Sequence, residues 1–343
     1  MGFQHIFDNG AVQWLKPVDM SLSPYAIPVA KELEAAEDVL KTTLTSEVPL
    51  VTEVVQYIIQ NGGKRLRPLL TLLAAKHSGY RGDAGPRLAA AMEMIHTASL
   101  LHDDVVDDAS LRRGKASAKA KWGNSISILV GDFFWCKMSR IIVDHGSLRI
   151  LKVVTDTITK TTEAEILEIT RHSDFSIDEE TYLKIIGGKT ACLLAACCQV
   201  GAILGEVSEN YEAALKRYGY DLGIAFQLAD DILDYVSEEA LFGKHKGGDL
   251  REGKLTFPLI VALRRADGEE AKLVKNAMLG GHIGAENLKA VLDIIQRYDG
   301  MERTRELSAR YAEKAKKHLE PFKGSLEKES LLGLADYVVE RDE

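Results

Sequence analysis

Residues 193–204 read LLAACCQVGAIL, a segment in which Gln199 is the single polar side chain. A helix that is apolar on nearly every face is typical of the centre of a bundle rather than of its surface. On both sides of this segment, apolar residues recur at helical spacing from about Ile27 to the C-terminus, as at Leu88 and Met92. The sequence contains no alternating, strand-like run flanked by hairpin turns. It therefore predicts an all-α fold.

No long linker divides this helical pattern. The breaks between segments are short and rich in glycine, as at 62–63 and 187–188, and none is a Pro/Ser-rich stretch. We therefore expect one large helical domain over residues 24–343, preceded by an N-terminal extension of residues 1–23. The extension is interpreted as a tail that packs locally, with an interfacial anchor or a partner contact as the alternative.

The composition is that of a globular protein, with 46% hydrophobic and 27% charged residues among 343. A formal net charge of −8 argues against a nucleic-acid surface, which needs a basic excess. No apolar run approaches the roughly 20 residues that cross a bilayer, and no secretory signal is evident, so we expect a cytoplasmic protein without a transmembrane segment. The cysteines lack CxxC spacing and are expected to be buried thiols: Cys136, Cys192, Cys197 and Cys198.

Two acidic clusters of the form DDxxD occur, in SLLHDDVVDD (99–108) and in AFQLADDILDY (225–235). On a helix, the first and last aspartates of each cluster lie on one face about 6 Å apart. Like charges repel at this spacing and the flanking residues are apolar, so each cluster needs a cation. Carboxylates without a matching His or Cys set favour magnesium shared with a substrate's phosphates over a merely solvated acidic face. The candidate metal ligands are Asp103, Asp104, Asp107, Asp230, Asp231 and Asp234.

Basic segments accompany the acidic clusters. GGKRLRP (62–68) sets three cations after a glycine pair and before a helical stretch, where backbone amides also favour anions. The pair 112–113 follows the first acidic cluster, and GKHKGGDLREGK (243–254) follows the second. Each segment alone fits an ordinary surface loop, but a diphosphate group fits all of them. The GKT at 188–190 is not a nucleotide P-loop, because Leu183 stands where its first glycine belongs and no strand precedes it.

The order of these blocks resembles the trans-isoprenyl diphosphate synthase family, from about residue 25 to the end of the chain. The matching blocks are GGKRLRP, LLHDDVVD followed by RRG, VGD (130–132), GKTA, FQLADDILD and GDLREGKLTFP. The long-chain bacterial members of the family look most similar. The resemblance implies a helical bundle around a deep central cavity, with the two DDxxD helices facing each other across its mouth. It also implies a homodimer, and Mg²⁺ as cofactor, with three ions when substrate is bound.

The reaction that the resemblance implies is a head-to-tail prenyl transfer. Isopentenyl diphosphate would be joined to an allylic diphosphate, giving an all-trans polyprenyl diphosphate of C30 or longer and releasing diphosphate. Ionisation of the allylic C–O bond leaves charge on the diphosphate, which metal ions and fixed cations stabilise. The carbocation needs dipoles and no nucleophile, and the final proton passes to the released diphosphate. This accounts for the lack of an evident general base or Ser/His/Asp triad in the sequence.

The resemblance assigns roles to individual positions. The six aspartates would bind magnesium, and the catalytic set would include Asp103, Asp104, Asp107 and Asp230. Isopentenyl diphosphate would be held by Lys64, Arg67, His96 and Arg113. The allylic diphosphate would be held by Arg112, Lys189, Thr190, Gln227, Lys244 and Lys254, of which all but Lys254 also belong to the catalytic set. Lys246 is a weaker candidate, because the His245-Lys246 pair departs from the family's pattern, as does the extra carboxylate Asp108.

Small residues one helical turn before the first acidic cluster indicate a long product. Ala98 and Ser99 would line the path of the growing chain, where shorter-chain relatives of the family carry bulky aromatics, so the resemblance implies an open tunnel here. Phe133, Phe134 or Met138 could form its floor, although all three are interpreted first as core residues. Release of the product could involve peripheral contact with a membrane.

Two other functions share part of this pattern. A class I terpene cyclase would have the cavity and the metal site but would not need a second diphosphate pocket, so Lys64, Arg67 and Arg113 argue against it. A non-catalytic subunit of a heteromeric synthase usually lacks one acidic cluster, and both clusters are present here.

Overall fold

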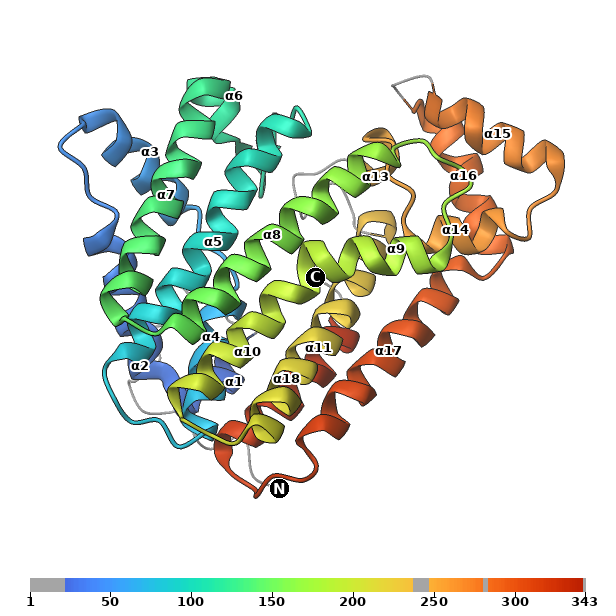
Figure 1. Ribbon diagram of the computed structural model, residues 1–343. Coiled ribbons are helices and arrows are strands. Elements are labelled where there is room, and N and C mark those ends of the chain that lie inside the picture. The colour runs from blue at the N-terminus through green and yellow to red at the C-terminus, as the bar shows by residue number, and fades with distance from the viewer. Residues whose placement is uncertain (1–21, 237–246, 280–282, 342–343) are drawn as a thin grey trace, which may run out of the picture.

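The structure, a computed structural model, describes residues 22–236, 247–279 and 283–341. It is a bundle of helices (Figure 1), so the all-α prediction is confirmed. Within the described ranges the extended structure is one short hairpin, β1 (Leu111–Arg112) paired with β2 (Lys115–Ala116).

The helices of the first part of the chain are α1 (Ser23–Ala26), η3 (Ile27–Val29), α2 (Ala30–Thr43), α3 (Pro49–Gln60), α4 (Leu66–His77), α5 (Ala84–Val106), α6 (Ala118–Trp122), α7 (Asn124–His145) and α8 (Leu148–Thr170). Those of the second part are α9 (Glu179–Ile186), η4 (Gly187–Ala191), α10 (Cys192–Leu204), α11 (Glu209–Val236), α13 (Gly248–Arg251), α14 (Phe257–Leu263), α15 (Gly268–Leu279), α16 (Ala285–Arg297), α17 (Gly300–Leu319) and α18 (Leu326–Glu340).

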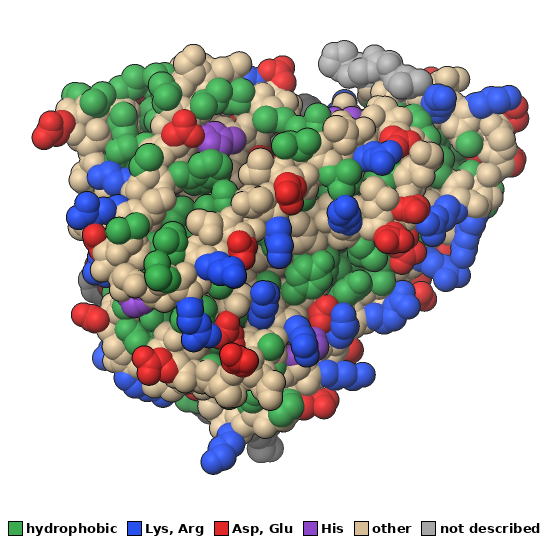
Figure 2. All heavy atoms as spheres, in the orientation of Figure 1, with side chains coloured by type: hydrophobic (Ala, Val, Ile, Leu, Met, Phe, Trp, Pro, Cys, Tyr) green, Lys and Arg blue, Asp and Glu red, His purple; other side chains and the backbone are tan. Residues whose placement is uncertain are grey.

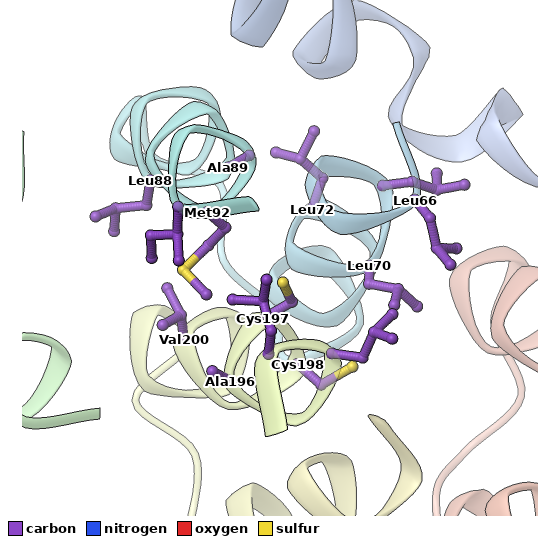
Figure 3. Close-up of a cluster of buried hydrophobic side chains, with 14 of the residues drawn as sticks. Leu66, Leu70, Leu72, Leu88, Ala89, Met92, Ala196, Cys197, Cys198 and Val200 are labelled. Carbon is purple, nitrogen blue, oxygen red and sulfur yellow. The ribbon is translucent and has the colours of Figure 1, made fainter. Parts of the chain in front are cut away.

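The apolar segment 193–204 forms most of α10 and lies inside the bundle, as predicted. Figure 3 shows its side chains facing those of α4 and α5. Small residues allow the close approach of α4 and α10, because a Cβ on Gly201 would lie 2.6 Å from the backbone nitrogen of Ala75 and from the carbonyl oxygen of Thr71. An alanine at position 201 would therefore force the two helices apart.

The cysteine prediction is correct for the two residues in this core. Cys197 and Cys198 are fully buried, and burial raises the pKa of the Cys197 thiol to about 12. Cys192 is half-buried, and the prediction is wrong for Cys136, which is exposed on α7. Apolar neighbours do not indicate burial on this helix, because Ile128, Leu129 and Val143 are exposed on it as well.

A second buried cluster lies around α14, α15, α16 and α17. The long helix α11 joins the two clusters, because Leu222 packs in the first and Leu228, less than two turns later, packs in the second. Its C-terminal half carries the second DDxxD, so the packing of both clusters fixes the position of these aspartates.

The chain from Glu179 to Leu204 is one continuous helical run in which η4 is a π-helical turn between α9 and α10. By length and composition this run could span a membrane, but 83% of its most apolar window is buried inside the protein. The sequence interpretation placed a break between segments at the Gly187-Gly188 pair. In the structure the pair lies within the helical run, and its lack of side chains allows close packing on α8, since a Cβ on Gly188 would meet the Cβ of Ala164 at 2.5 Å.

Candidate active site

Both acidic clusters line one cavity of about 430 Å³, and three basic residues assigned to the allylic diphosphate lie beside them, namely Arg112, Lys189 and Lys254. Asp103 and Asp107 lie on α5 and the turn after it. Asp231 and Asp234 lie on α11. The lysines and arginines among its lining residues are Arg112, Arg171, Lys189, Arg251 and Lys254. The structure thus joins segments that lie up to about 150 residues apart, as the contact between Lys254 and Asp107 shows directly (Nζ to Oδ2, 3.1 Å).

The first cluster lies at the end of α5, where each carboxylate has a different environment. Asp104 is buried and accepts a hydrogen bond from Arg112 Nε at 2.6 Å, on the side of a second, smaller cavity. Asp107 caps α5 and pairs with Lys254. The pKa of Asp103 is raised to about 7, because burial and the negative charges of Glu165 and Asp107 outweigh the attraction of nearby cations.

The second cluster lies on α11, and other groups of the protein donate hydrogen bonds to its carboxylates. Asp231 is buried and accepts hydrogen bonds from Tyr182 Oη and from Gln227 Nε2, the latter at 3.0 Å. Its pKa is nevertheless raised to about 7, because burial outweighs these two hydrogen bonds and the neighbouring aspartates repel its charge. Asp234 accepts bonds from the backbone nitrogens of Gly248 and Asp249, at 3.1 and 3.2 Å.

The π-helical turn places Lys189 and Thr190 between the two clusters. Lys189 Nζ donates to Glu165 and Glu168 of α8 at 3.0 and 2.6 Å. Burial alone would lower the pKa of Lys189, but these two carboxylates raise it above its usual value, so the amine stays charged. Thr190 Oγ1 donates to Gln227 Oε1 at 2.7 Å, which gives a hydrogen-bonded chain from Thr190 through Gln227 to the second cluster. π-helical turns of this kind occur often at functional sites.

Two residues assigned to isopentenyl diphosphate, His96 and Arg113, line a separate cavity beside α5, whereas Lys64 and Arg67 are not among its described lining residues. A small cavity of about 60 Å³ is lined by Gly62, His96, Arg112 and Arg113 among others. Burial, and then the charges of Arg67 and Arg113, lower the pKa of His96 well below its usual value, so the imidazole is neutral. Arg113 Nη1 donates to the carbonyl oxygen of Gly62. Lys64 donates to Tyr337 Oη at 3.2 Å.

The residues assigned to product length lie close to these groups. Ala98 is fully buried on α5, and Ser99 is half-buried and donates from Oγ to the carbonyl oxygen of His96 at 2.8 Å. Phe134 and Met138 are buried core residues of α7, and Phe133 packs against the core from a half-buried position. The tunnel past Ala98 and Ser99 stays a prediction.

Some predicted residues fall outside the described ranges, namely Lys244, Lys246 and residues 1–21 of the extension. Just after these two lysines, the backbone nitrogens of Gly248 and Asp249 donate hydrogen bonds to the carboxylate of Asp234. Several site residues were missed from the sequence: Glu93, Glu165, Glu168, Tyr182, Asp249, Tyr337 and Arg341. Of these, Glu165 and Glu168 carried a signal, because carboxylates three residues apart on a helix share a face. Glu93 and Asp249 lie close in sequence to predicted residues, whereas Tyr182, Tyr337 and Arg341 reach the site through tertiary packing.

The comparisons with known proteins agree with this geometry. A family model described as Polyprenyl synthetase matches residues 48–295. The octaprenyl diphosphate synthase of Escherichia coli (strain K12) is 39% identical over 313 residues, which cover 91% of this chain and 97% of that protein. Among solved structures, the polyprenyl synthase from Caulobacter crescentus CB15, complexed with calcium and isoprenyl diphosphate, has a TM-score of 0.90 at 37% identity, covering 94% of this chain and 98% of that one. A decaprenyl diphosphate synthase from Rhodobacter capsulatus has a TM-score of 0.89 at 38% identity, covering 94% and 99%.

Proposed function

Because this chain belongs to the polyprenyl synthetase family, we propose that prenyl transfer takes place in the 430 Å³ cavity between α5 and α11. The protein is a magnesium-dependent prenyltransferase, which condenses isopentenyl diphosphate with an allylic diphosphate to a long all-trans polyprenyl diphosphate and releases diphosphate. The observation that carries the site assignment is the facing of the two aspartate clusters across one cavity whose walls also hold Lys189 and Lys254.

The donors of the cavity fit magnesium. Asp103 and Asp231 have raised pKa values because they are buried near other carboxylates, and a cation removes that repulsion. Among the described residues no three His, Cys, Asp or Glu side chains form a ready-made metal cage. Magnesium commonly takes one or two carboxylates and completes its shell with water and substrate phosphates. We assign three ions, held by Asp103, Asp104, Asp107, Asp230, Asp231 and Asp234.

Held by these carboxylates, magnesium would supply positive charge that stabilises the departing diphosphate. Arg112, Lys189 and Lys254 hold the same group, and Lys244 is assigned to it as well. The hydroxyl of Thr190 and the amide oxygen of Gln227 lie 2.7 Å apart and present lone pairs to the carbocation without stably capturing it. The proton that leaves after bond formation passes to the released diphosphate.

Isopentenyl diphosphate occupies the basic pocket on the other side of α5. Lys64, Arg67 and Arg113 supply positive charge, and His96, neutral at physiological pH, supplies a hydrogen bond. The growing chain runs past Ala98 and Ser99 into the bundle. We assign these functions to one catalytic domain, 24–343, of a cytoplasmic protein that contacts membranes at most peripherally during product release.

The outer face of α7 favours a homodimer. Ile128, Leu129 and Val143 are exposed to 41%, 62% and 62% on this helix. Exposed apolar surface, which Figure 2 shows in green over α7, often marks an interface in soluble proteins. We therefore expect Leu129→Glu to convert a dimer to a monomer in light scattering, and a wild-type protein that is already monomeric would overturn the dimer.

Purified protein incubated with Mg²⁺, radiolabelled isopentenyl diphosphate and C5, C10, C15 or C20 allylic starters tests the function. We expect labelled products of C30 or longer after dephosphorylation. A terpene cyclase would instead release hydrocarbon from the starter alone, and a non-catalytic subunit would give no product. Lack of incorporation with every starter would overturn the proposal.

A further inference from the structure

A buried ion-pair triad lies beneath the GGKRLRP turn. Arg65 Nε donates to Glu37 Oε1 of α2 at 2.5 Å, and Arg65 Nη1 donates to Glu93 Oε1 of α5 at 3.0 Å. The three side chains are exposed to 6%, 4% and 5%. We call Glu37, Arg65 and Glu93 the buried triad. Burying three charges is unfavourable unless they pair and hydrogen-bond with good geometry, because each one is removed from water.

The backbone of Arg65 is also unusual. Its φ of 52° and ψ of 31° place it in the left-handed region at the N-cap of α4. This region is unfavourable for a residue with a Cβ, and glycine or asparagine adopts it more readily. The carbonyl oxygen of Arg65 nevertheless accepts the hydrogen bond from Leu69 N at 3.1 Å that opens the helix. The ion pairs on both sides of the guanidinium therefore hold a turn that the residue's own preference opposes.

The left-handed turn directs Arg65 away from the two flanking cations, Lys64 and Arg67. Lys64 reaches α18, where it donates to Tyr337 Oη. Arg67, on the first turn of α4, has a buried Nε without a hydrogen-bond partner in the described part of the chain. Arg65 itself points between α2 and α5. A change of φ at this one residue would re-aim both flanking side chains.

We propose that Arg65 is a positioning residue for isopentenyl diphosphate: its ion pairs with Glu37 and Glu93 fix the left-handed turn that presents Lys64 and Arg67 to one diphosphate. This inference rests on the proposed assignment of Lys64 and Arg67 to that substrate.

The triad also balances charge in the basic pocket. It carries two carboxylates and one guanidinium, and Glu93 lies one turn before His96 on α5. Burial lowers the pKa of Arg67 and of Arg113, and the charge of Glu93 acts against that lowering at both. The second oxygen of Glu93 has no partner among the described residues. The carboxylate of Glu93 thus offsets part of the cost of burying these two guanidinium groups.

The test is steady-state kinetics of Arg65→Lys and Glu37→Gln with each substrate varied separately. Lysine keeps the charge but lacks the planar fork that bridges two carboxylates. Glu37→Gln leaves Arg65 balanced by Glu93 and retains an acceptor oxygen, so it preserves folding if Arg65→Lys does not. We expect KM for isopentenyl diphosphate to rise about tenfold in Arg65→Lys and less in Glu37→Gln, while KM for the allylic substrate and kcat change by less than about twofold.

Two comparisons make the outcome specific. Val291→Ala, in the remote second cluster, is fully buried and controls for loss of stability, so it should lower Tm without changing KM for isopentenyl diphosphate. Lys64→Ala and Arg67→Ala should raise that KM strongly. If they do and both triad variants leave it unchanged, or raise both KM values equally, the positioning role is wrong. If Lys64→Ala and Arg67→Ala leave it unchanged, the substrate assignment itself is wrong.

Discussion

Arg341 Nη2 donates to Asp230 Oδ1 at 2.5 Å, and the guanidinium lies 4.0 Å from the ring centre of Phe226. The same side chain donates to the carbonyl oxygen of Phe226 at 2.9 Å and is only 3% exposed. The end of α18 is thereby tied to the first aspartate of the second cluster, 111 residues earlier in the chain. A protein cation therefore occupies a carboxylate that we assign to magnesium.

Removing this cation should strengthen magnesium binding. In Arg341→Gln the metal no longer displaces a guanidinium from Asp230, so the Mg²⁺ concentration at half-saturation should fall about fivefold, since a half-exposed pair is worth up to about 1 kcal/mol. The measurement is the rise in Tm on titration with Mg²⁺ at constant inorganic diphosphate. Arg297→Gln, which removes an ion pair with Glu270 between α15 and α16, serves as control. An unchanged or higher half-saturating concentration would contradict the prediction.

The metal-free protein should lose stability as the pH rises from about 4 to about 7. Asp103 and Asp231 both have pKa values raised from 3.8 to about 7 in the folded chain. Because the folded state binds their protons more tightly than the unfolded state does, this stabilisation is complete below pH 3.8 and is lost as the pH rises to about 7. The free energy of unfolding should therefore decrease over that interval in urea melts recorded with a chelator.

Magnesium should reverse the trend, because it binds the deprotonated carboxylates. The rise in Tm produced by Mg²⁺ with inorganic diphosphate should be larger at about pH 8 than at about pH 6. Asp231→Asn should weaken the pH dependence of the metal-free protein, whereas the exposed Asp299→Asn should not. Equal stabilisation by Mg²⁺ at both pH values would show that these carboxylates do not take up the metal.

The acidic clusters could be found from the sequence because the aspartates of each cluster lie within five consecutive residues. Four-residue spacing alone places Asp103 near Asp107 and Asp230 near Asp234 on their helices. Arg341 and Tyr182 could not be found in this way, because they reach the second cluster from other helices, and only the packing of both cores determines which helix ends meet. The exposure of Cys136 was also missed, because tertiary packing, and not the local sequence, determines which face of α7 is covered.

The π-helical turn was also beyond the sequence interpretation, which treated the glycine pair as a break. A matched glycine comparison tests its importance. In Gly188→Ala the new Cβ would lie 2.5 Å from Ala164 Cβ and 3.0 Å from the carbonyl oxygen of Lys160, so α8 must shift. We expect a loss of about 1–3 kcal/mol in the free energy of unfolding. The allylic KM should also rise, because α8 carries the carboxylates that orient Lys189.

Gly324→Ala is the control for this change, because its Cβ would meet nothing within 4 Å and its backbone is not in the left-handed region. Both substitutions add one methyl group, so a difference between them reports the contact with α8. If Gly188→Ala lowers stability but leaves the allylic KM at the wild-type value, the turn supports the fold and does not position Lys189.

Product length should depend on the wall that precedes the first aspartate cluster. Ala98 is fully buried one turn before Asp103, so a bulky ring there would fill the predicted path of the chain. We expect Ala98→Tyr, and the milder Ser99→Phe at a half-buried position, to shorten the product by at least one isoprene unit, measured by chromatography after dephosphorylation. Ala89→Tyr lies on the opposite face of α5 and controls for overpacking. It should lower Tm and leave product length unchanged, and the same length in all three variants would reject a tunnel along this face.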